Sequence, residues 1–293
     1  LSTLTYLLAG RAVHRDSTGS VQTIEAVAVN WMTAGAGVTH TERSHPDDVD
    51  RPRELFGVQT WVALPDHDED GAARFEHAAI DDVPTDSRAG VRVAVATGTA
   101  FGMSSPVAGS SPLMLVDVSL DGGAVAVERD HPDRAVVALD GAVTVAGSPL
   151  PVGSMAVLDP GVRPELAGTG RAILLGGDPV GRRHIWWNFV HSDPDRIEHA
   201  KSDWRSQRFP VVPGDHAEEM DHGGDHADPE AGEGGEHGDS TLDEVNRTVA
   251  TSGGQSREVV GQESVGETAD RRGEGDVARV TGHGLGMLPR SPA

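Results

Sequence analysis

The feature that most constrains this chain is the recurrence of short β-branched or apolar runs through residues 1–213, each closed by Gly, Pro, Asp or Asn. Runs spaced by about 8–12 residues, with turn signals between them, are typical of antiparallel sandwiches and barrels. We therefore predict an all-β fold. The expected strands are 3–8, 12–15, 23–25, 29–32, 38–42, 58–64, 75–80 and 91–97, then 113–120, 124–127, 134–139, 142–145, 154–158, 165–167 and 172–176.

These two series of strands predict two β-barrels in tandem. In the second series, Asp140-Gly141 lies between two alternating runs, which predicts a tight hairpin turn. The first series has a weaker version of the same order of strands and turns. We place the N-terminal barrel at residues 1–111 and the C-terminal barrel at residues 112–213.

One helix is expected at residues 193–207, inside the second unit. Ser192 or Asp193 can cap it, and Pro194 suits its first turn. Ile197, Ala200 and Trp204 have the spacing of one buried helix face.

Residues 214–293 differ from the rest of the chain. They hold 16 Gly, 18 acidic residues and 6 Arg, with no aromatic residue. Such a composition buries too little apolar surface to offset the ordering of the backbone, so a disordered acidic tail is expected.

Composition excludes several functional classes. The chain has no Cys, so thiol nucleophiles and zinc–thiolate sites are excluded. A net charge of −22 without a basic stripe disfavours direct nucleic-acid binding. No run reaches the roughly 18 apolar residues of a membrane span, and the N-terminus lacks the basic start of a signal peptide. We expect no membrane partner and a cytoplasmic location.

The sequence "NWMTAGAGVTHTER", from Asn30 to Arg43, ends in His40-x-Glu42. On a strand, residues i and i+2 point to the same face, so both side chains would project together. An imidazole nitrogen and a carboxylate oxygen suit a divalent first-row metal. The spacing alone is weak evidence, because an exposed polar strand edge has the same pattern.

The same string resembles the pirin family of the cupin superfamily. The segments "LSTLTYLLAGRAVHRDSTG" and "FGVQTWVALP", and the closing segment from "AILLGGDPVG" to "FPVVPGD", are also similar to pirins. The resemblance spans roughly residues 1–215. It implies a bicupin, in which two cupin-type barrels lie together and the N-terminal one holds a single metal. Iron is the metal favoured, with Cu, Ni, Mn and Zn as alternatives.

Pirin metal sites use three His and one Glu. The resemblance assigns His40 and Glu42 as two of these ligands, and Glu42 also as the catalytic base. The other two come from an H-x-H that would precede Leu1, so we expect two ligands and the first strand to be missing from this chain. A weakly bound metal is then expected. His14 and His45 are the residues of the chain that could substitute for the missing ligands. The favoured expectation is that His14 orders a turn through Asp16 or Ser17 and that His45 lies in a loop.

Three functions follow from the resemblance. The first is a quercetin 2,3-dioxygenase, an enzyme that takes a small aromatic substrate such as a flavonol. The second is a metal-dependent regulatory pirin that binds a protein partner. The third is an inactive fragment with an incomplete metal site. Substrate selectivity and oligomeric state have no signal in the sequence.

Overall fold

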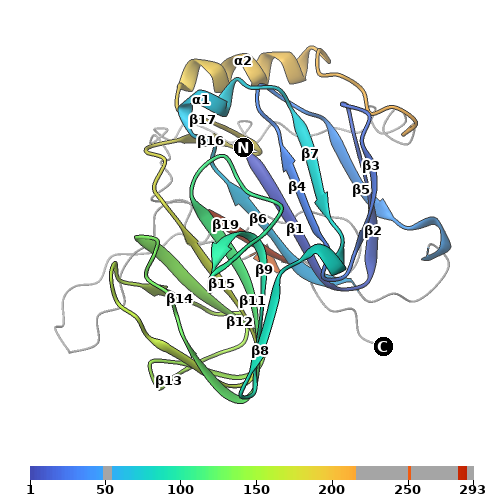
Figure 1. Ribbon diagram of the computed structural model, residues 1–293. Coiled ribbons are helices and arrows are strands. Elements are labelled where there is room, and N and C mark those ends of the chain that lie inside the picture. The colour runs from blue at the N-terminus through green and yellow to red at the C-terminus, as the bar shows by residue number, and fades with distance from the viewer. Residues whose placement is uncertain (49–54, 216–249, 252–282, 289–293) are drawn as a thin grey trace.

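The computed structural model describes residues 1–48, 55–215, 250–251 and 283–288. It has two β-rich halves that lie side by side, with a helix over the N-terminal half (Figure 1). No helix among these residues is long and apolar enough to cross a bilayer.

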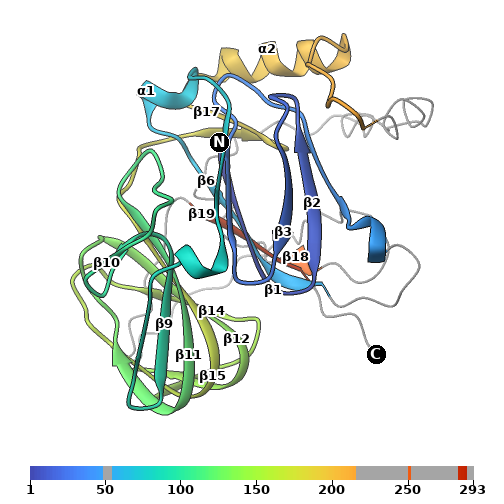
Figure 2. The same cartoon turned by 45° about the vertical axis from the view of Figure 1, so that its right-hand side comes forward.

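The N-terminal half is built from two facing sheets (Figure 2). One sheet has the order β18-β19-β6-β1-β4-β7, and the other has the order β3-β2-β5. The strands of the first sheet are β1 (Ser2–Ala9), β4 (Val29–Thr33), β6 (Phe56–Val62), β7 (Arg74–Ala78), β18 (Ala250–Thr251) and β19 (His283–Leu288). Those of the second are β2 (Arg11–Asp16), β3 (Val21–Glu25) and β5 (His40–Ser44).

The C-terminal half is one 8-stranded sheet with the path β10-β9-β11-β15-β12-β13, to which β8 and β14 add at β9 and β12. Its strands are β8 (Thr85–Arg88), β9 (Val91–Ala100), β10 (Met103–Ser104), β11 (Leu113–Ala126), β12 (Asp133–Val145), β13 (Ser148–Leu150), β14 (Met155–Leu158) and β15 (Glu165–Gly177). The remaining elements are η1 (Pro46–Asp48), α1 (Asp66–Glu69), η2 (Ile80–Asp82), β16 (His184–Trp186), β17 (Phe189–His191) and α2 (Pro194–Arg205).

Strand alternation separates two cores. Along β11, Met114, Val116 and Val118 pack inside the C-terminal barrel with apolar side chains of β12 and β15. Leu113 and Leu115 point the other way, into a core shared with β1 and β4. The interior of the C-terminal barrel is therefore packed with apolar residues, whereas the second core joins the two halves.

A buried polar network crosses this junction. The Tyr6 hydroxyl of β1 donates to Asp117 Oδ2 of β11 at 3.0 Å, and Arg171 of β15 pairs with the same carboxylate. Tyr6 and Asp117 are both fully buried. A buried carboxylate is tolerated because three donors satisfy it.

The two sheets divide at a different place from the boundary predicted at residue 111. β8, β9 and β10 precede it, yet β9 pairs with β11 along most of its length, which places them in the C-terminal sheet. Conversely, α2 lies over the N-terminal half (Figure 1). Hydrogen bonding between strands, which sequence spacing does not report, sets these memberships.

The hairpin predicted at Asp140-Gly141 is also wrong. β12 continues through both residues and pairs with β15 on either side, with a register shift between Ala138 and Asp140. Gly141 has φ +70°, as a bulge with a left-handed residue requires. The true β12–β13 turn uses Ala146 and Gly147, both at positive φ. The long neighbouring strand keeps β12 extended where the local signal favours a turn.

The helix and the tail agree only in part with what the sequence predicts for them. α2 starts after Asp193, whose side chain accepts from the Asp195 backbone N–H, and Ile197 is buried as expected. Trp204 was expected on the buried face, but it is 53% exposed, and Lys201 is buried in its place. Most of the predicted disordered tail, 214–293, lies outside the described residues. Within it, residues 283–288 form β19 on the edge of β6, so disorder does not hold there.

Candidate metal centre

The site is built by the pairing of β2 with β5. The antiparallel register places His14 opposite Glu42 and Asp16 opposite His40. Residues opposite each other in such a pair share a face of the sheet, so these four side chains lie on one face. That face points across the barrel toward Thr5 of β1, whose hydroxyl reaches Glu42.

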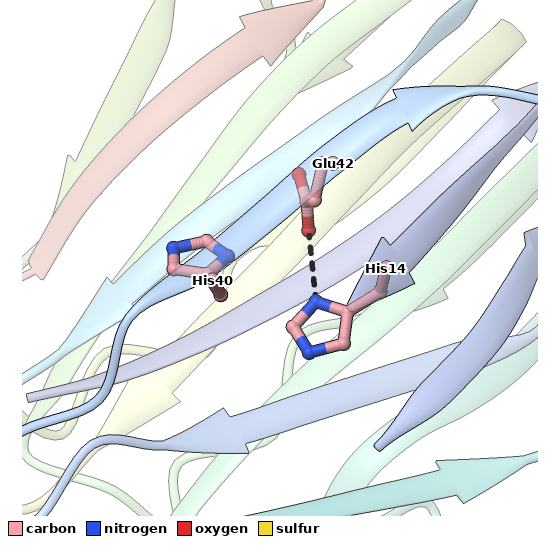
Figure 3. Close-up of side chains that lie close together, drawn as sticks. All are labelled: His14, His40 and Glu42. Carbon is pink, nitrogen blue, oxygen red and sulfur yellow. Dashed lines mark ion pairs between the residues drawn. The ribbon is translucent and has the colours of Figure 1, made fainter. Parts of the chain in front are cut away.

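Three of these side chains form a compact donor cluster (Figure 3). One ligand atom from each of His14, His40 and Glu42 lies within 4.8 Å of the others. His14 Nδ1 is 4.0 Å from Glu42 Oε1, and the two imidazole rings lie 5.5 Å apart, inclined by 28°. Two imidazoles and one carboxylate are the donor set that non-haem iron oxygenases use.

Asp16 determines which nitrogen of His14 faces the cluster. His14 Nε2 lies 3.1 Å from Asp16 Oδ2, and both residues are buried. An ionised carboxylate accepts a hydrogen bond from Nε2–H, which leaves the Nδ1 lone pair free to bind a metal. Thr18 and Ser20 donate to Asp16 Oδ1, and these hydrogen bonds hold the pKa of Asp16 below its usual range against the opposing effect of burial.

His40 has a buried Nδ1 with no hydrogen-bond partner within the described part of the chain. Burial lowers the pKa of His40, partly offset by the Glu42 carboxylate. The ring is therefore neutral near pH 7, and a neutral imidazole has a lone pair to offer. A buried ring nitrogen without a partner calls for a physical explanation, and binding to a metal ion would provide one.

Glu42 is held by two side chains from the opposite sheet. Thr5 donates to its Oε1 at 3.0 Å, and the Gln59 amide donates to its Oε2 at 3.0 Å. Gln59 also donates to Thr5, its neighbour across β1 and β6. The Glu42 side chain is 25% exposed, so a small molecule can reach the carboxylate.

The turn before β5 is also fixed in place. Gly35 has φ +53°, and a Cβ there would lie 2.1 Å from the backbone oxygen of Gly71. Ala36 donates its backbone N–H to that same oxygen. Glycine is required by both the conformation and the close approach, and the turn brings His40 to the barrel interior.

The two residues that we predicted as ligands, His40 and Glu42, are thus together on one face. The expected contact between His14 and Asp16 is confirmed, but His14 is also a member of the cluster, although the sequence favoured a turn-ordering role for it over a ligand role. The signal was present, because His14-x-Asp16 repeats the spacing of His40-x-Glu42. Recognising it required the register between β2 and β5. His45 lies apart from the cluster, close to Asp47.

The chain matches known families over both halves. Residues 1–62 match the pirin family model, and residues 115–210 match the model of the pirin C-terminal cupin domain. A pirin-like protein from Caulobacter vibrioides is 41% identical over 227 residues, which are 74% of this chain and 77% of the relative.

Two solved structures have the same fold. A quercetin 2,3-dioxygenase from Acinetobacter baumannii aligns with a TM-score of 0.67 and 32% identity, over 73% of this chain and 72% of that protein. A second quercetin 2,3-dioxygenase structure from this organism aligns with a TM-score of 0.68 and 28% identity, over 72% and 76% of the two chains. The family models, the close bacterial relative and the shared bicupin fold show that this chain belongs to the pirin family of the cupin superfamily.

Proposed function

We propose that this protein binds one divalent metal through His14, His40 and Glu42 and is a dioxygenase of flavonol-type substrates. The observation that carries this proposal is the convergence of the three donors on one face of the β2–β5 pair. The names of the two similar solved structures, both quercetin 2,3-dioxygenases, support the substrate class.

The donor set fits a first-row metal. Two imidazoles and a carboxylate favour iron and accept copper, nickel, manganese or zinc, which have overlapping preferences. The unpartnered Nδ1 of His40 and the Asp16-oriented Nδ1 of His14 are both consistent with a metal ligand role. When bound, such a metal supplies open coordination positions for a substrate oxygen and for dioxygen.

The residues of the chain would perform three tasks around the metal. Asp16 keeps His14 in the tautomer that presents Nδ1. Thr5 and Gln59 hold the two oxygens of Glu42, so the carboxylate has a defined direction. Glu42 also accepts the proton of the substrate hydroxyl at a carboxylate oxygen, as a base exposed enough to be reached.

Metal content of the purified full chain tests the site. Wild type should take up one equivalent of Fe²⁺ under anaerobic conditions, and His40→Ala and His14→Ala should each lose most of it. His45→Ala is the matched control, because His45 follows β5 closely but lies outside the cluster. Equal metal content in all four proteins would exclude this site.

Substrate consumption tests the activity separately. The loaded wild type should bleach a flavonol with uptake of dioxygen, and His40→Ala should not. Full metal occupancy without flavonol consumption would exclude the dioxygenase and favour the alternative, a metal-dependent pirin that binds a protein partner. Failure of both tests would favour the inactive fragment.

A further inference from the structure

The segment after α2 returns to the strand that holds His40 and Glu42. α2 lies over the N-terminal half (Figure 1), and residues 206–215, which we call the C-terminal strap, follow it. The strap belongs to the sequence of the C-terminal unit, but its side chains contact β5 and the turn before it.

The first anchor of the strap is aromatic. Phe209 stacks on Phe189 of β17 with ring centroids 5.7 Å apart, and it meets Trp204 of α2 edge-on at 5.8 Å. Phe209 Cε1 also lies 3.5 Å from the position of a Cβ at Gly37, in the turn that leads into β5. Phe209 thus packs against that turn.

The second anchor is Asp215. Its Oδ2 accepts from the Thr41 hydroxyl at 2.7 Å and from Arg43 Nε at 2.6 Å. The Asp215 side chain is only 5% exposed, and Val212 and Thr41 beside it are buried. The Asp215 carboxylate is shielded from water, whereas the Arg43 side chain is 44% exposed. The hydrogen bond from the buried Thr41 hydroxyl therefore holds its geometry better than the ion pair to Arg43, which solvent weakens.

The two donors to Asp215 alternate with the proposed ligands. Thr41 and Arg43 are on the outer face of β5, and His40 and Glu42 are on its inner face. Because the contacts of Asp215 restrain the outer face of β5, they also fix the twist and position of the strand. The directions of the inner side chains depend on that twist and position. Donor positions matter, because a metal centre needs its ligands within about 0.5 Å of the productive geometry.

We propose that Asp215 is a positioning residue for the metal centre, acting through Thr41 and Arg43 on strand β5. This inference rests on the proposed function. Its consequence is that the C-terminal end of the cupin region controls a site that lies wholly in the N-terminal barrel.

The test compares three variants of the full chain. Asp215→Ala removes both hydrogen bonds. Asp215→Asn keeps one oxygen that can accept both of them. Asp203→Ala is the matched control: it also removes an aspartate paired with an arginine, but that arginine, Arg208, belongs to the strap and not to β5. Thermal unfolding of each apo-protein measures any general loss of stability.

Co²⁺ is the probe, because its visible absorption reports ligand geometry as well as affinity. Asp215→Ala should weaken Co²⁺ binding about 10-fold, within the range for residues that orient ligands, and should alter the spectrum. Asp215→Asn and Asp203→Ala should remain near wild type. In the apo-proteins, amide hydrogen exchange of β5 should accelerate in Asp215→Ala alone.

The outcomes separate the two proposals. No Co²⁺ uptake by wild type overturns the proposed function, and the positioning role with it. Uptake by wild type with equal affinity and spectrum in Asp215→Ala overturns the positioning role alone. An affinity loss in Asp215→Ala that Asp203→Ala shares, with an equal fall in the thermal stability of both apo-proteins, also overturns it, since the effect would then reflect general destabilisation.

Discussion

Tyr6 provides a test of the junction between the two barrels. It is the one tyrosine of the chain, so its ionisation can be followed without interference. Its hydroxyl donates to Asp117, and its ring is fully buried. Burial raises the pKa of Tyr6 far above the ordinary value of about 10, and the neighbouring Asp117 carboxylate raises it further.

The sign of the effect on stability follows from this direction. The raised pKa means that the folded protein favours the neutral phenol, so the contribution of Tyr6 is complete below pH 10. Above about pH 10 the unfolded chain releases this proton and the folded chain retains it, so stability falls by about 1.4 kcal/mol per pH unit from this group. Tyr6→Phe removes a hydrogen bond to a charged group, worth about 1.5–3 kcal/mol at neutral pH.

The assay is an alkaline titration of wild type and Tyr6→Phe. In wild type, phenolate absorbance should rise only together with the loss of β-sheet circular dichroism. Urea unfolding should find the variant less stable at pH 8, with a deficit that narrows between pH 10 and 11. Phenolate absorbance that rises near pH 10 in an intact fold would refute the buried network. So would a deficit below about 0.5 kcal/mol at pH 8.

Three further predictions concern the site and the framework. Asp16→Asn presents an amide donor to His14 Nε2 and favours the tautomer with a proton on Nδ1. Metal affinity, measured by competition with a chelator, should therefore fall about 10-fold or more. Unchanged affinity would exclude His14 Nδ1 as a ligand. Arg183→Met removes the cation that pairs with the buried Glu69, and the free energy of unfolding in urea should fall by about 3–5 kcal/mol. Arg196→Met removes one partner of an exposed pair, and the same free energy should fall by about 0–1 kcal/mol. Equal losses in the two variants would contradict the role of burial. Gly98→Ala should cost about 3 kcal/mol or more, because its Cβ would lie 1.7 Å from the Leu113 oxygen at a φ of +74°. Gly102→Ala has a similar φ but open space, and should cost about 1 kcal/mol; equal costs would show that the clash relaxes.

Local sequence signals predicted the positions of strands and helices better than they predicted which strands pair with each other. The runs of 29–32 and 75–80 became β4 and β7, and Asp193 capped α2 as expected. Those features depend on neighbouring residues, whose side-chain period and capping chemistry can be read in sequence. The turn predicted at Asp140-Gly141 is absent because the long neighbouring strand β15 keeps that part of β12 extended.

The candidate site shows the same division. His40 and Glu42 were predictable, because two residues on one strand share a face whatever the strand pairs with. His14 was not, because its membership depends on the register of β2 against β5. The Asp215–Thr41 hydrogen bond joins residues that are 174 positions apart in the sequence, and the Tyr6–Asp117 hydrogen bond joins residues 111 positions apart.

The sequence by itself therefore determined the all-β class, the C-terminal helix, two of the three candidate metal donors and the resemblance to pirins, all of which rest on local pattern or on long matching strings. Only the tertiary structure decided where the two sheets divide, that His14 lies beside His40 and Glu42, and that Asp215 of the C-terminal strap contacts strand β5. These depend on contacts between segments far apart in the chain, whose free energy comes from burial and shared hydrogen bonds that no local window contains.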